Sequence, residues 1–351
     1  MEVIHPDSLL GQRNFTKAHE RDPQAAGDQP GNELAGIGPI PVERVGRDQN
    51  MHKPESSLIL FWMRHFAKII RHPAIPCYIC ARVCTAGPVP GPHRAYRFRY
   101  NFAMLRLMCI TAHPDDEAGG FGGTLLKYRS AGVETSVVCL TPGQAATHRG
   151  GAKTDQELAE MRKREFAAAC ETLRVTRPVI FDYPDGQLYL QNVNRVVYAL
   201  TLEIRKFLPQ VIMTFGADGG VTGHPDHSMA GMFASLAFQW AGRNNRYADQ
   251  LNSEIQPHRT QKLYYGTADF VIPGRQPITL APHTATIDVK PFFETKVAAF
   301  KKHTTQAPLW PLFEQNVRGR GEKELFHLAA IIKSGPVKQE TDLFEGVDEA
   351  A

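Results

Sequence analysis

From residue 104 onward, short apolar runs alternate with longer segments in which apolar residues recur every three or four positions. Short apolar runs are typical of strands buried on both faces, and the periodic segments are typical of amphipathic helices. The runs predict strands over residues 105–111, 135–140, 179–183, 211–215, 263–265 and 286–289. The segments between them predict helices that end near Gly132, that begin at Thr154, and that cover residues 193–207, 229–240 and 292–303.

Two of these helices carry further signals. Thr154 is followed three residues later by Glu157, which is the spacing of a capping box at a helix start. The helix that Gly242 closes has an apolar stripe, which predicts a core-facing side made of Met229, Met232, Phe233, Leu236, Ala237 and Trp240. Strands that alternate with helices of this length predict right-handed βαβ units, so we expect an α/β fold with a mostly parallel sheet.

Residues 1–103 lack this regular pattern and are rich in Pro, Gly, Gln, Asn, Arg and His. Such a composition predicts a low-complexity N-terminal extension that is disordered, and Met104 is an alternative start of the protein. We expect one domain over residues 104–335. Residues 336–351 are an acidic C-terminal segment, which predicts a frayed tail.

Composition narrows the class of protein. Hydrophobic residues make up 42% of the 351 positions and charged residues 22%, as in an ordinary soluble protein. The net charge of +4 is too small and too dispersed to indicate nucleic-acid binding. No apolar run approaches the about 20 residues of a membrane span, and no secretory signal opens the chain, so we expect a cytoplasmic protein. The oligomeric state stays open, and a homo-oligomer is one of the states that the sequence allows.

The six cysteines fall into two groups. Those in predicted strands or helices are expected to be buried thiols: Cys109, Cys139 and Cys170. The others form a C-x2-C-x3-C motif with no fourth cysteine nearby, and its role stays open: Cys77, Cys80 and Cys84.

Two polar clusters follow predicted strands. The first is Ala112-His113-Pro114-Asp115-Asp116-Glu117, and the second is His224-Pro225-Asp226-His227. Ligands of open α/β sheets bind at the carboxyl ends of the strands, so two such clusters predict one metal site assembled across the sheet. Either cluster alone could be a helix cap, but two clusters that both read His-Pro-Asp argue against that alternative.

A catalytic zinc ion usually has three protein ligands and one open position. His113 and Asp116 lie on one tight turn, and His227 can supply the third ligand. Asp115 and His224 are then left beside the ion. A carboxylate there is a natural general base, and an imidazole can stabilise an oxyanion or protonate a leaving amine. The set therefore predicts metal-assisted hydrolysis.

These residues make the chain resemble the LmbE-like (PIG-L) family of zinc-dependent deacetylases over about residues 104–310. Further motifs support the resemblance: Gly122-Gly123-Thr124, Thr141-Pro142-Gly143, Arg162-x-x-Glu165, Pro184-Asp185-Gly186 and Lys296…His303-x-x-Gln306. The resemblance implies a Rossmann-like, three-layer α/β/α fold and an LmbE-like deacetylase domain over residues 104–335. It also implies one Zn²⁺ per chain, although Fe²⁺ could take its place.

The resemblance also implies roles for individual residues. His113, Asp116 and His227 would bind zinc, with Asp115 as general base and His224 as the electrophilic or acidic partner. Asp226 would orient a neighbouring imidazole. Three positions would contact substrate, each with a plainer alternative: Arg162 as an exposed i,i+3 partner of Glu165, Asp185 as a turn residue, and Gln306 as a surface residue.

The implied reaction is removal of an acetyl group from an N-acetylated, amino-sugar-type substrate, free or part of a glycoconjugate. Zinc-bound water would attack the amide while Asp115 takes its proton. Some sugar-acting members have a tyrosine where this chain has Thr222, two residues before His224, so the specific substrate stays open.

Parts of the sequence also fit three other functions. A catalytically silent metal- or sugar-binding module would need neither Asp115 nor His224. His113, Asp115 and His227 also fit the ligands of an Fe(II) oxygenase, but those enzymes are usually all-β. The glycines of residues 119–123 do not complete a dinucleotide-binding motif, because Leu125 occupies its last position, so we expect them to allow close helix–sheet packing.

Overall fold

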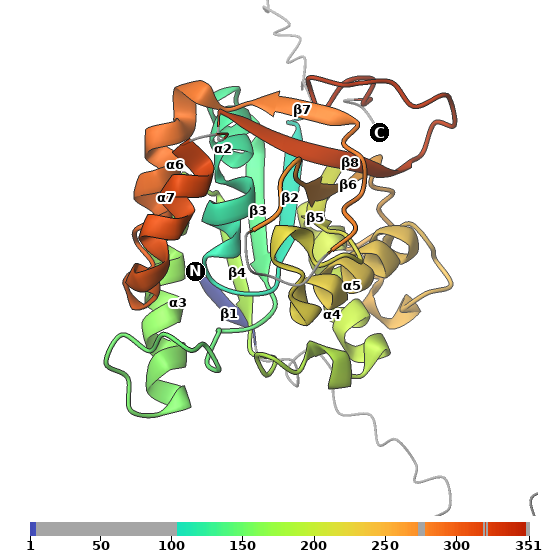
Figure 1. Cartoon of the computed structure of the whole chain (residues 1–351). Coiled ribbons are helices and arrows are strands. Elements are labelled where there is room, and N and C mark those ends of the chain that lie inside the picture. The colour runs from blue at the N-terminus through green and yellow to red at the C-terminus, as the bar shows by residue number, and fades with distance from the viewer. Residues whose placement is uncertain (5–103, 273–277, 319, 321, 349–351) are drawn as a thin grey trace, which may run out of the picture. The chain divides into compact units, whose positions relative to one another are not determined.

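The predicted strands lie in one sheet in the computed structural model, which describes residues 1–4, 104–272, 278–318, 320 and 322–348 (Figure 1). The order across the sheet is β1-β4-β3-β2-β5-β6-β8-β7, and among the described strands only β8 runs in the opposite direction to the others. Their bounds are β1 Glu2–Ile4, β2 Arg106–Thr111, β3 Glu134–Cys139, β4 Arg177–Phe181, β5 Val211–Phe215, β6 Lys262–Thr267, β7 Ala285–Asp288 and β8 Lys323–Ile331.

Helices cover both faces of this sheet, which confirms the α/β, Rossmann-like, three-layer α/β/α fold (Figure 1). One face carries α2 (Asp116–Ser130), α3 (Asp155–Thr172), α6 (Phe293–Phe300) and α7 (Trp310–Arg318), and the other carries α4 (Val193–Phe207) and α5 (Pro225–Ala241). Short 3-10 helices are η2 Leu188–Leu190, η3 Gly220–Thr222, η4 Ala248–Gln250, η5 Lys290–Phe292 and η6 Thr304–Leu309.

Several local predictions are confirmed. Both halves of the capping box at the start of α3 form: Glu157 N–H donates to Thr154 Oγ1 at 3.1 Å, and Thr154 N–H donates to Glu157 Oε2 at 3.4 Å. The predicted close packing of the α2 glycines is confirmed at Gly123, where a Cβ would lie 2.6 Å from Val289 Cβ, but not at Gly120, where a Cβ would meet nothing within 4 Å. The three cysteines Cys109, Cys139 and Cys170 are buried and free.

The predicted apolar stripe of α5 is wrong in part. Met232 is 51% exposed, and the buried positions of this helix include Ala230, Phe233, Ala234, Ala237 and Ala241. The reason is close approach to β5, because a Cβ on Gly231 would lie 2.1 Å from the Phe215 carbonyl oxygen. The helix therefore needs a small residue where it meets β5, and the large side chains of Met229, Leu236 and Trp240 are only partly buried.

The predicted frayed tail is also corrected. Residues 336–339 are exposed, but Glu340 N–H donates to Thr284 O and Thr286 N–H donates to Glu340 O, both at 2.9 Å. Lys262 Nζ contacts Glu340 Oε1 at 2.7 Å, and Leu343 is fully buried. The acidic residue has a buried cationic partner on β6, so this part of the segment packs against the sheet.

Apart from residues 1–4, the predicted disordered extension and the motif of Cys77, Cys80 and Cys84 lie outside the described residues. The short edge strand β1, which pairs with β4, stands where the sequence predicts no element. Helix α7 and strand β8 were not predicted either. In the part of the chain that the structure describes, no helix has the length and apolar character needed to span a membrane.

The connections place a switch point beside β2. From β2 the chain builds β3 and β4 on one side, and then returns to add β5 on the other side of β2. β2 and β5 are parallel neighbours, so their carboxyl ends lie at the same edge of the sheet. Open α/β sheets bind ligands at such a point.

Candidate active site

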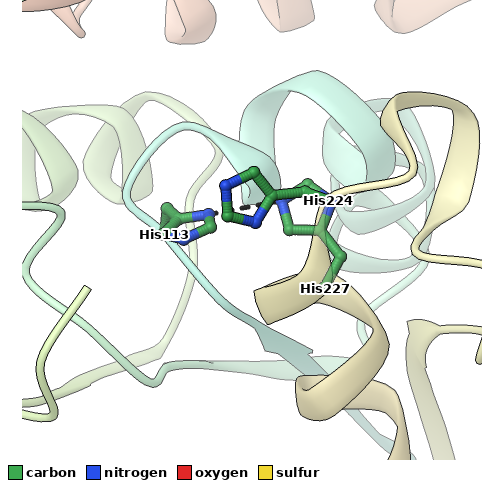
Figure 2. Close-up of side chains that lie close together, drawn as sticks. All are labelled: His113, His224 and His227. Atoms are coloured by element: carbon green, nitrogen blue, oxygen red, sulfur yellow. Dashed lines mark hydrogen bonds between the residues drawn. The ribbon is translucent and has the colours of Figure 1, made fainter. Parts of the chain in front are cut away.

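The segments after β2 and β5 bring the two predicted clusters together. His113 follows β2, and His224 and His227 come from the start of α5, and their three rings converge (Figure 2). His113 Nδ1 lies 3.2 Å from His227 Nε2, although the two residues are 114 positions apart in the chain. The rings of His113 and His224 have their centroids 4.8 Å apart.

Asp116 completes a compact donor group. Its Oδ1 lies 3.1 Å from His227 Nε2, and its Oδ2 lies 3.6 Å from His113 Nδ1. Ligand atoms about 2.0–2.1 Å from a tetrahedral ion are about 3.3 Å from one another, so these separations suit one small divalent cation. The three side chains are at most 10% exposed. This His/Asp group could therefore bind a metal.

Outer contacts orient the two imidazoles. His113 Nε2 lies 3.0 Å from Asp185 Oδ1 and 3.4 Å from Asp226 Oδ2. His227 Nδ1 lies 3.2 Å from the Gly219 carbonyl oxygen and 3.1 Å from Thr222 Oγ1. Each ring thus uses one nitrogen for a protein partner and directs the other toward the donor group, as metal-binding histidines do.

Asp185 and Asp226 are fixed by backbone donors. Asp226 is fully buried and accepts the N–H groups of Gly186 at 2.7 Å and Leu188 at 3.1 Å. Asp185 accepts the Ala145 N–H at 2.9 Å. Burial would raise the pKa of each carboxyl, but the hydrogen bond and charge of His113 hold both pKa values below the ordinary one. Asp226 therefore lies where an orienting role was predicted, and Asp185 lies beside it against the same ring.

Asp115 has an unusual backbone. Its φ of 115° falls in the left-handed region, and its side chain makes no capping bond to α2. The Asp115 N–H donates to Glu117 Oε2 at 3.0 Å, and Arg162 Nη2 donates to Asp115 Oδ2 at 2.9 Å. Surrounding contacts must hold such a strained residue in place. The helix-cap alternative therefore does not describe the Asp115 side chain.

Burial raises the pKa of Asp115 to about 6, although the Arg162 guanidinium acts in the opposite direction. Arg162 is 3% exposed, and it also donates to the carbonyl oxygens of Gly143, at 3.0 Å, and Pro114. Gly143 has a φ of +70°, and a Cβ there would lie 2.2 Å from Arg162 Nη1. The glycine is needed to admit the arginine.

The exposed Arg162–Glu165 pair considered from the sequence is therefore wrong. Glu165 is buried, and it accepts the Thr305 N–H at 2.8 Å and the Thr305 hydroxyl at 2.7 Å. Gln306 is also buried rather than a surface residue, and its Nε2 donates to the His148 carbonyl oxygen at 3.0 Å. Both contacts tie η6 to the segments around the site.

Sequence reasoning missed a buried pair behind Asp115. The Glu117 carboxylate is fully buried and lies 2.7 Å from His303 Nε2. Its other oxygen accepts the Asp115 N–H. Burial would lower the pKa of His303, but the charge of Glu117 and its hydrogen bond raise it above the ordinary value. The available signal was the motif Lys296…His303-x-x-Gln306, which already contained His303.

Replacing His303 with leucine is expected to lower the free energy of unfolding by about 3–5 kcal/mol, because the buried Glu117 carboxylate loses its partner. Chemical denaturation of both proteins measures the difference. His283 is exposed, so His283→Leu is the matched control and should leave stability unchanged. Equal stability of His303→Leu and this control would contradict the ion pair.

The geometry also bears on the rival functions. An Fe(II) oxygenase would use Asp115 as a ligand, but Arg162 engages that carboxylate and Asp116 faces the histidines instead. The sheet is mixed, with helices on both faces, rather than all-β. Gly123 of α2 packs against Val289 and Glu324, and its N–H donates to Glu324 Oε1 at 2.9 Å.

Comparison with known proteins gives consistent matches. The family model described as "PIG-L: GlcNAc-PI de-N-acetylase" matches residues 108–238. Mycothiol S-conjugate amidase of Streptomyces coelicolor is 32% identical over 204 residues, which are 53% of this chain and 67% of that protein. Diacetylchitobiose deacetylase of Thermococcus kodakarensis is 30% identical over 220 residues, which are 61% of this chain and 76% of that protein.

A solved structure supports the fold. N,N'-diacetylchitobiose deacetylase from Pyrococcus horikoshii superposes with a TM-score of 0.55 and 23% sequence identity. The match covers 64% of this chain and 83% of that one. The architecture built here from βαβ units is thus the architecture of that protein.

Proposed function

Because this chain belongs to the PIG-L family of GlcNAc-PI de-N-acetylases, we propose that it is a zinc-dependent amidohydrolase that removes the acetyl group from an N-acetylated amino-sugar substrate. The observation that carries the proposal is the partly buried Asp115 carboxylate, which Arg162 holds beside the donor group of His113, Asp116 and His227. The two relatives are named as an amidase and a deacetylase, which supports hydrolysis of an amide.

His113, Asp116 and His227 would hold the metal. Their spacing and the outer contacts of both imidazoles fit Zn²⁺, and the same donors could hold Fe²⁺. Zinc bound there would polarise the amide carbonyl and lower the pKa of a water molecule. The remaining steps belong to side chains of the protein.

Asp115 acts as the general base in this proposal. Arg162 engages its Oδ2, so we assign the proton transfer from the attacking water to Oδ1. A pKa of about 6 leaves most of the carboxyl groups ionised near neutral pH, which suits a base working there. Asp115 then returns the proton to the leaving amine. A C–O bond forms and the C–N bond breaks, which gives acetate and a free amine.

His224 serves the carbonyl oxygen. Its Nδ1 accepts the Asp226 N–H at 3.1 Å, so its Nε2 carries the proton and can donate to the oxyanion. Burial lowers the pKa of His224, and the neighbouring His113 and His227 lower it further. Thr222, which stands in place of the tyrosine of some relatives, lies against His227 Nδ1. The oxyanion contact therefore falls to His224 in this chain.

The zinc-loaded protein is expected to release acetate and a free amine from at least one member of a panel of N-acetylglucosamine, diacetylchitobiose and N-acetylglucosaminyl glycoconjugates. A coupled acetate assay and an amine-reactive dye measure the two products independently, and glucosamine is the blank. A silent panel with one zinc bound per chain would instead support the alternative, a catalytically silent metal- or sugar-binding module of the same fold.

A further inference from the structure

A cavity of about 260 Å³ opens beside the catalytic group. Asp115, Asp116 and His227 line one end of it. The rest of its wall is largely apolar and comes from α2, α6, η6, α7, the end of β5 and the segments after β5 and β6. Its large apolar residues are Phe215, Phe270, Phe300, Leu309, Leu312 and Phe313. The stacked rings of Phe300 and Phe313, with centroids 3.8 Å apart, form one side.

The cavity is too large for an acetyl group. An apolar cavity of about 150 Å³ lined by similar side chains binds benzene in another protein. On that scale, about 260 Å³ takes roughly eight to ten carbon atoms. The methyl group of an acetamide would leave most of this apolar wall in contact with water.

The chemistry of the wall selects which part of an amide can enter. A sugar placed among these phenylalanines and leucines would bury hydroxyl groups without hydrogen-bond partners, which is unfavourable. An acyl chain has no such groups beyond its carbonyl. The carbonyl carbon must lie next to Asp115 and the donor group, and Asp115, Asp116 and His227 are part of the cavity wall. An acyl chain attached to that carbon would therefore lead directly into it.

We propose that this cavity holds the acyl chain of the substrate, and that the protein hydrolyses N-acyl amino sugars with linear chains longer than acetyl. The inference rests on the proposed function for the reaction itself. The reaction is the same hydrolysis. The amide and one water molecule give a fatty carboxylate and a free amine, as the C–N bond breaks and a C–O bond forms.

The test is a chain-length series on the zinc-loaded full chain. N-acetyl-, N-butyryl-, N-hexanoyl- and N-octanoylglucosamine are compared by amine release. Each buried methylene is worth about a fourfold gain, so kcat/KM should rise at least roughly 100-fold from acetyl to octanoyl. A flat or falling series, with acetate release intact, would overturn the inference and leave the proposed deacetylation standing.

Two variants probe the wall itself. Leu312→Asp puts a charge at the cavity, and Gly120→Leu narrows it, since a Cβ on Gly120 meets nothing within 4 Å. Each should lower the octanoyl-to-acetyl ratio of kcat/KM at least tenfold. Met232→Asp is the matched control. Leu312 and Met232 are both exposed apolar residues, but Met232 lies on α5 and does not line the cavity, so this variant should leave the ratio unchanged. An unchanged ratio in both cavity variants would count against the inference.

A binding measurement separates the two proposals. Titration calorimetry compares octanoate with acetate on the zinc-loaded protein, and octanoate should bind at least tenfold more tightly, with the difference lost in Leu312→Asp. If no amide is turned over at any length but this difference is found, the proposed reaction fails and the acyl cavity stands. Equal binding of the two carboxylates would overturn the cavity assignment.

Discussion

Replacing Asp115 with asparagine is expected to lower kcat by roughly 10²–10⁴-fold, the contribution of a positioned general base, while one zinc ion stays bound per chain. Asparagine is the informative substitution for two reasons. It tolerates the positive φ of 115°, and its amide oxygen can still accept from Arg162. The loss of kcat should therefore result from the missing general base, and not from a changed conformation of the turn after β2.

Steady-state kinetics and metal analysis by mass spectrometry measure the two quantities on the same samples. Asp288→Asn is the matched control, because Asp288 is an exposed carboxylate at the end of β7. Full turnover in Asp115→Asn would refute the assigned role. Loss of zinc from that variant would instead make Asp115 a ligand.

The second large effect is expected from His227→Ala, which should lose both bound zinc and activity. His227 Nε2 lies within 3.2 Å of donor atoms on His113 and on Asp116. The substitution therefore removes the donor atom that lies next to both of the other ligands. Replacing a residue that only orients a metal ligand lowers the metal affinity about 10–100-fold. Replacing a ligand itself should lower the affinity further. Zinc per chain should fall from one to near zero at equal free zinc.

His283→Ala is the control for this variant, since it removes an exposed histidine. Chelation of the wild-type protein should give the same loss of activity, and added zinc should restore it there but not in His227→Ala. A variant that keeps one tightly bound zinc would show that the ion lies elsewhere. Activity that survives chelation would show that no metal takes part.

The periodicity of the chain predicts most of the α/β core. The predicted helix over 193–207 and strand over 211–215 match α4 and β5 at both ends. The meeting of His113 with His227 also follows from the sequence, because a parallel sheet brings the carboxyl ends of its strands to one edge. Strand β8 was missed because its buried positions include the polar Glu324, which takes hydrogen bonds from α2.

Contacts between distant polar residues could not be predicted in this way. The bond from Arg162 to Asp115 depends on how close α3 lies to the turn after β2, and the Glu117–His303 pair joins positions 186 residues apart. Neither contact leaves a periodic trace, since each involves one side chain per element. The packed tail around Glu340 is similar, because its acidic composition does not reveal the buried lysine that it meets on β6.

The order of strands has a consequence for synthesis of the protein. β2 lies at the centre of the sheet, but the strand that covers one of its edges, β5, begins at residue 211. At about 5–20 residues per second, a ribosome needs roughly 5–20 s to add the hundred residues between them. During that interval this central, largely buried strand has an unpaired edge, which is a hazard for aggregation. A chaperone bound to the nascent chain in that interval would protect this edge.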